Sequence, residues 1–143
     1  MLAGNLGHLG EQIMSDQIDQ SLALKTWAVV GLSNNSERAA YGVAKLLIEK
    51  GHTVIPVHPK AESVHGQKGY AKLSDIPVSI DVVDIFVNSD LAGNVVDEAI
   101  TIGAKGVWLQ LDVIDAAAVS RAKDAGLLTV MNRCPAIEYK KRV

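Results

Sequence analysis

One polar loop, residues 31–38, has the composition of a phosphate-binding site. It joins a short apolar run to the start of a helical pattern. Amides at a helix start point outward and carry the positive end of the helix dipole, so an anion is stabilised there. With Gly31 as its only glycine, the loop is neither the GxGxxG motif of dinucleotide-binding proteins nor a P-loop. It predicts a phosphate site, and the alternative is a polar strand-to-helix turn capped by Ser36.

A second feature is the charge at the end of the next apolar run, which reads Val57-His58-Pro59-Lys60. Proteins that bind NAD place Asp or Glu there to hold the ribose hydroxyls. A basic residue in that position favours a ligand with an extra phosphate on the ribose, such as NADP or coenzyme A. The alternative for Lys60 is a solvated surface charge.

The sequence lacks the motifs that organise catalysis: a GxSxG elbow, HExxH, paired cysteine ligands and a phosphoryl-transfer loop. His52, His58 and His65 have no metal-ligand spacing, and we expect them at the surface or in packing. Cys134 is the one reactive candidate, because the neighbouring Arg133 would raise its thiolate fraction. Its alternative is a small packed hydrophobe. We therefore expect that the protein has no metal site and is not an enzyme.

Composition limits the class of protein. The chain has 143 residues, 48% of them hydrophobic and 21% charged, which suits one globular domain with a full core. A net charge of −2 provides no basic field for nucleic acid. The apolar runs are shorter than the ~20 residues of a membrane span. A single cysteine excludes an internal disulfide, so we expect a cytoplasmic protein with no membrane or nucleic-acid partner.

Apolar runs and helical patterns alternate along the chain, and these elements must position the two features. Residues 1–24 are expected to form a frayed tail, 1–10, and a short helix, 15–24, ahead of one domain, 25–143. Short strands separated by helices predict an α/β fold: a Rossmann-like, doubly wound, five-stranded parallel sheet in three layers. The expected strands are 26–30, 52–57, 81–86, 106–111 and 127–131. The expected helices are 40–50, one capped by Ser89 or Asp90 that ends at Gly103, and one capped by Asp115 that ends at Gly126.

Ligands of such a sheet bind outside the carboxyl ends of the strands, where the strand order reverses. The loops after the expected strands concentrate polar residues, as binding loops do. Trp27 and Trp108 lie within strands and are expected in the core. The candidate ligand-binding residues are Gly31, Leu32, Ser33, Arg38, His58, Pro59, Lys60, Asn88, Gln110 and Cys134.

Several segments together resemble a known family: 31–33 with Arg38 and Tyr41, 54–60, Gly66 with 69–70, 100–110 and the tail motif 130–138. They are similar to the small bacterial and archaeal CoA-binding proteins, which resemble the CoA-binding domain of succinyl-CoA synthetases standing alone. The resemblance covers about 25–138. It implies that coenzyme A or an acyl-CoA is the ligand, that loop 31–38 binds the pyrophosphate and that Lys60 lies near the ribose phosphate.

The sequence also departs from that family. The family often has Pro-Ser where this chain has Ala39-Ala40, Arg in place of Val87, Gly in place of Asp112 and Asp in place of Asn132. Loss of an Arg and gain of an acid near the crevice predict weaker phosphate binding. Three functions are therefore open: a non-catalytic CoA-binding protein, an NADP-linked oxidoreductase or redox sensor, and an interaction module whose nucleotide site has decayed.

Overall fold

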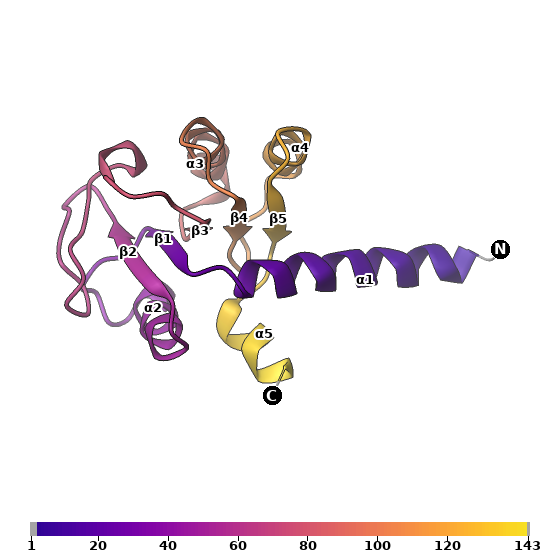
Figure 1. Cartoon of the computed structure of the whole chain (residues 1–143), viewed down its shortest axis with the longest axis horizontal. Coiled ribbons are helices and arrows are strands. Elements are labelled where there is room, and N and C mark those ends of the chain that lie inside the picture. The colour runs from indigo at the N-terminus through magenta and orange to yellow at the C-terminus, as the bar shows by residue number, and fades with distance from the viewer. Residues whose placement is uncertain (1–2, 143) are drawn as a thin grey trace.

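The computed structural model describes residues 3–142, with side chains from Leu9 onward. Five parallel strands form one sheet in the order β2-β1-β3-β4-β5. Helices α3 and α4 cover one face and α2 and α5 the other, so the predicted three-layer α/β fold is confirmed (Figure 1). The strands are β1 (Thr26–Val30), β2 (Thr53–Val57), β3 (Val82–Ile85), β4 (Gly106–Leu109) and β5 (Leu128–Met131). The helices are α1 (Ala3–Leu22), α2 (Ala39–Glu49), η1 (Leu73–Asp75), α3 (Ser89–Thr101), α4 (Ala116–Asp124) and α5 (Pro135–Lys141).

The strands are buried on both faces, as their continuous apolar runs require. Trp27 and Trp108 are fully buried beneath α2 and α5, with ring centroids 5.5 Å apart, which confirms their place in the core. Each indole N–H is satisfied: Trp27 donates to Leu24 O (3.0 Å) and Trp108 to Arg133 O (2.9 Å). These bonds fix the segments that precede β1 and follow β5.

The N-terminal segment is helical over a longer range than predicted: the expected helix is present, but the expected frayed tail is helical from Ala3. Helix α1 begins at Ala3, inside the expected tail, and ends at Leu22, whereas Met1 and Leu2 lie outside the described residues. Its second half packs on the sheet through Ile18 and Leu22, and Gln17 Oε1 accepts the Thr129 N–H of edge strand β5 (2.9 Å). Once this turn is fixed, the helix propagates toward its N-terminus in spite of its glycines, so that α1 projects past β5 (Figure 1).

The helix starts partly match the prediction. Asp115 caps α4, because its carboxylate accepts the Ala118 N–H (3.0 Å). Ser36 does not cap α2: the N-cap is Arg38, which makes no side-chain capping bond. Helix α3 follows Asn88, also without a side-chain cap, so neither Ser89 nor Asp90 has the predicted role. Helix α5 was not predicted. No helix in the described part of the chain combines the length and apolarity needed to cross a bilayer.

Candidate ligand crevice

A crevice of about 980 Å³ opens at the carboxyl ends of β1, β2 and β3, between the first turns of α2 and α3. The chain leaves β1 for β2 on one side and returns to β3 on the other, so this is the point where the strand order reverses. The volume lies at the upper end of the range for small-molecule sites. Seven of the predicted residues line it: Gly31, Ser33, Arg38, His58, Pro59, Lys60 and Asn88.

Gly31 turns the chain from β1 into the crevice. Its φ is +98°, a left-handed conformation that favours glycine, and its N–H donates to Val57 O (2.8 Å). A Cβ at this position would lie 2.6 Å from Phe86 O. The turn therefore requires glycine for the fold itself, whatever the crevice binds.

The loop after Gly31 is ordered by its own polar groups. Asn35 N–H donates to Ser33 Oγ (3.2 Å), and Glu37 N–H donates to Asn35 Oδ1 (3.0 Å). Asn34 Nδ2 donates to Ser63 O (2.9 Å), in the connection after β2. The loop reaches the start of α2 in a fixed conformation that no bound anion has to impose.

The first turn of α2 faces the crevice. Ala39 and Ala40 line it, and the helix has no side-chain cap. The first amides of a helix lack intrahelical acceptors and concentrate positive potential. Ala39 is exposed, whereas Ala40 is 2% exposed. Both side chains are small, so replacing Pro-Ser by Ala39-Ala40 adds no bulk at this end of the helix.

Three cations line the crevice, Arg38, Lys60 and Lys72, against two carboxylates, Glu62 and Glu98. Across residues 9–142, none of the three cations takes part in an ion pair. The wall at the end of β2 is fixed by its turn: Lys60 N–H donates to His58 Nδ1 (3.2 Å), and His58 N–H donates to Tyr70 O (3.0 Å). The lining therefore has one more cation than carboxylates, and none of its cations is held in an ion pair with them.

Three predicted residues do not line the crevice. Leu32 is fully buried in the core beneath α2, and Cys134 is 8% exposed in the same core. Gln110 is 5% exposed, and its Oε1 has no hydrogen-bond partner. All three follow strand ends, but the direction of the backbone there turns their side chains into the protein. The burial of Cys134 favours its packing role over reactivity.

Sequence reasoning missed part of the lining. Lys72 and Leu73 come from the long connection after β2, which Tyr70 brings back to the sheet by donating its N–H to Pro56 O (3.0 Å). The segment Gly69-Tyr70 is a signal for this approach, since a Cβ on Gly69 would overlap Glu62 O. The α3 side is lined by Leu91, Asn94, Val95 and Glu98, whose helical spacing marks one face.

Two of the departures from the family contact each other outside the crevice. Asp112 and Asn132 have left-handed φ values of 67° and 60°, and Asn132 Oδ1 accepts the Asp112 N–H (2.8 Å). Neither residue lines the crevice, whereas Val87 does. Val87 and the pair Ala39-Ala40 are therefore the departures that lie in the crevice itself.

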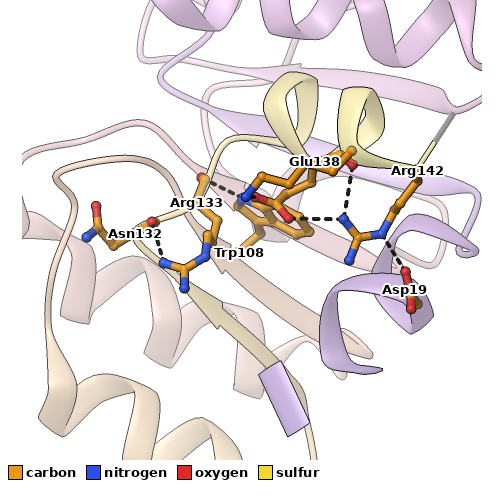
Figure 2. Close-up of polar contacts among 7 residues, drawn as sticks. Asp19, Trp108, Asn132, Arg133, Glu138 and Arg142 are labelled. Carbon is orange, nitrogen blue, oxygen red and sulfur yellow. Dashed lines mark hydrogen bonds and ion pairs between the residues drawn. The ribbon is translucent and has the colours of Figure 1, made fainter. Parts of the chain in front are cut away.

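The tail motif anchors α5 and α1 (Figure 2). Glu138 is 4% exposed and accepts hydrogen bonds from Arg142 (3.0 Å) and Lys141 (3.3 Å). Arg142 also pairs with Asp19 on α1. Arg133 donates from its guanidinium to the Asn132 carbonyl (3.0 Å). This cluster, which we call the α1–α5 corner, borders a separate hollow of about 400 Å³.

One buried acid lies outside both regions. Asp84 lies at the centre of β3 with 0% exposure, and neither carboxylate oxygen has a partner. Burial raises the pKa of its carboxyl group well above the ordinary value, because the charged form is desolvated. Within residues 9–142, no three His, Cys, Asp or Glu side chains are grouped closely enough to hold a metal ion.

Comparison with known proteins agrees with this architecture. The family described as CoA binding domain matches residues 25–140. YneT of Bacillus subtilis, an uncharacterized protein, is 31% identical over 110 residues, which are 77% of this chain and 82% of YneT. A hypothetical protein from Pyrococcus horikoshii superposes with a TM-score of 0.84 and 42% identity, covering 89% of this chain and 90% of its own. The alpha subunit of the ADP-forming acetate–CoA ligase II of Pyrococcus furiosus is 36% identical over 81 residues, 56% of this chain and 18% of that subunit.

Proposed function

The chain belongs to the CoA binding domain family, and on that premise we propose that its crevice binds coenzyme A or an acyl-CoA and catalyses no reaction on it. The observation that carries the proposal is the open start of α2 beside two cations without internal partners, Arg38 and Lys60. A diphosphate with a third phosphate nearby is the ligand chemistry that such a charge arrangement recognises.

Each part of the crevice has a role in this proposal. The amides of Ala39 and Ala40 and the guanidinium of Arg38 would bind the pyrophosphate. Lys60 lies one strand away, at the end of β2, and would contact the phosphate on the ribose. No acid stands at the end of β2 to bind the ribose hydroxyls. A 3′-phosphorylated ribose fits such a position, because a carboxylate there would repel its phosphate.

The histidines support a binding role rather than catalysis. His52 Nδ1 lies 2.8 Å from Leu24 O and its Nε2 contacts Tyr139, so both ring nitrogens are engaged in the fold. His65 Nε2 contacts Tyr41 O (2.8 Å). His58 lines the crevice, where its Nδ1 accepts a backbone N–H. None of them has the carboxylate partner that would orient a general base. A free ligand thiol and a single cysteine suit the cytoplasm, where we expect this protein to act.

A thermal-shift panel with CoA, acetyl-CoA, NAD and NADP tests the proposal. CoA at a hundredfold excess over its dissociation constant stabilises the folded state by roughly 2.7 kcal/mol, enough to raise the melting temperature by several degrees. We expect the shift with both CoA species and none with NAD. A shift with NADP or NAD, and none with millimolar CoA, would contradict the proposal.

A further inference from the structure

Two apolar side chains stand exposed on the loop after β4. Leu111 is 43% exposed and Ile114 is 51% exposed, whereas Val113 between them is 8% exposed and belongs to the core beneath α3 and α4. Isolated exposed aliphatic residues are common on protein surfaces. These two lie on one short loop at the carboxyl end of the sheet, the end that ligands occupy.

Hydrogen bonds hold this loop in one conformation. Asp112 N–H donates to Asn132 Oδ1 (2.8 Å), which ties the loop to the end of β5. Ser89 Oγ accepts the Ile114 N–H (3.0 Å) and donates to Asp112 O (3.3 Å), which ties the loop to the first turn of α3. Leu111 and Ile114 therefore lie on a preformed loop, and a ligand that covers these side chains does not have to order it.

The order of the strands places this loop at the far end of the proposed ligand. Lys60 follows β2 and the open start of α2 follows β1, so the phosphates would occupy the β2 and β1 end of the crevice. After β3 the crevice lining reaches Asn88, and it does not include Leu111 or Ile114. Ser89, the next residue, contacts their loop, so a ligand arm that leaves the crevice past Asn88 would run toward β4. Two strand spacings are about 10 Å, and the pantetheine arm of CoA is long enough to cross them. Its sulfur would thus reach the loop that carries Leu111 and Ile114.

We propose that Leu111 and Ile114 bind the acyl group of an acyl-CoA, and that this protein prefers a thioester with an apolar acyl chain to free CoA. The inference rests on the proposed function. Asp112 lies between the two residues in the sequence, and its exposed carboxylate would repel an acyl group that ends in a carboxylate. The loop thus selects aliphatic over dicarboxylic acyl groups.

The test is calorimetric titration with CoA, acetyl-, butyryl-, hexanoyl- and succinyl-CoA. Affinity should rise along the aliphatic series by up to about fourfold per added methylene, the equivalent of ~0.8 kcal/mol. Succinyl-CoA should bind more weakly than butyryl-CoA. Leu111→Ser and Ile114→Ser should each flatten the series. Val78→Ser is the matched control and should keep the wild-type slope, because Val78 is 56% exposed but precedes β3, on the side of the amino ends of the strands.

The outcomes separate this inference from the proposed function. Binding of CoA with a dissociation constant that does not change with acyl length would overturn the inference and leave the proposed function standing. The same result follows if both serine variants keep the wild-type slope. If neither CoA nor any acyl-CoA binds, both proposals fail. The wild-type series alone already decides the chain-length preference, so the test does not depend on the folding of any variant.

Discussion

The ligand crevice and the α1–α5 corner both contain arginine, lysine and glutamate, but these charges form ion pairs in the corner, whereas the cations of the crevice form none among residues 9–142. In the corner, Glu138 is 4% exposed and pairs with Arg142, which also reaches Asp19 on α1. In the crevice, Arg38 and Lys60 face a hollow of about 980 Å³ and take part in none of the ion pairs formed by residues 9–142. Charges that are buried and paired hold elements together, whereas cations left without a partner are available to an external anion.

This difference changes the meaning of the motifs in the sequence. The tail motif is the most distinctive part of the family resemblance, yet it builds the corner, with Arg133 O accepting from the Trp108 indole (Figure 2). The plainer loop 31–38 builds the crevice. Variants in the two regions should therefore separate, with stability changing in one and ligand affinity in the other.

The largest effect is expected at Gly31, because this residue lines the crevice and is also required by the fold. Gly31→Ala places a Cβ 2.6 Å from Phe86 O at a φ of +98° and should destabilise the fold by about 3 kcal/mol or more. Gly51→Ala is the matched control, since Gly51 has a φ of +95° and no atom within 4 Å of the added Cβ. That variant should lose only about 1 to 2 kcal/mol. Urea unfolding measures both; equal losses would show that the contact with Phe86 is unimportant.

The next largest effect is a difference in stability between two glutamate variants, one in the corner and one in the crevice. Glu138→Gln leaves the Arg142 guanidinium without its buried partner and should lower the free energy of unfolding by about 2 kcal/mol. Glu62→Gln in the crevice, where the residue is half-buried and takes part in none of the ion pairs of residues 9–142, should change stability by less than about 0.5 kcal/mol. Chemical denaturation of both variants checks the comparison. It fails if Glu62→Gln is the more destabilising of the two.

Asp84 belongs to neither region and should make stability depend on pH. Its folded-state pKa is raised by burial, so its contribution to stability is fully present below the unfolded pKa, about 3.8, and is lost as the pH rises toward the folded-state value. The free energy of unfolding of Asp84→Asn should therefore increase relative to that of the wild type as the pH rises, by up to about 1.4 kcal/mol per pH unit. Denaturation between pH 4 and 8 measures this. A constant difference would mean that Asp84 is ionised in the folded protein throughout.

The smallest effect concerns the choice of ligand by Lys60. A charge-assisted contact with the ribose phosphate should make CoA bind about tenfold more tightly than dephospho-CoA, and rising salt should weaken that preference. Lys60→Ala should remove most of the preference while its thermal stability stays close to that of the wild type. Calorimetry with both ligands checks it. An unchanged preference in the variant would assign the discrimination to another group.

The strands could be predicted because each is an apolar run with a residue at or near one end that interrupts the apolar pattern. Gly31 after β1 and Gly126 before β5 are examples, with φ values of +98° and +88°. The N-terminal extent of α1 could not be predicted in this way. It depends on tertiary contacts such as the bond between Gln17 and the backbone of Thr129, which connects residues far apart in the sequence.

The crevice was predicted in outline because the ends of parallel strands share one edge of the sheet. Which side chains point into it depends on the turn after each strand. Leu32 lies two residues after the end of β1 and Gln110 directly follows β4, yet both are buried. Lys72 could not be found from strand ends, because it reaches the crevice through the pairing of Tyr70 with Pro56.

The most direct measurement of the central claim is a calorimetric titration of CoA into three proteins: the wild type, Arg38→Ala and Arg133→Ala. The two arginines differ in region, one lining the crevice and the other the hollow beside the corner. We predict one CoA per wild-type chain, at least tenfold weaker binding by Arg38→Ala, since a charge-assisted hydrogen bond contributes about 1.5 kcal/mol or more, and wild-type affinity for Arg133→Ala. No binding by the wild type, or a loss at Arg133 with full affinity at Arg38→Ala, would contradict the account.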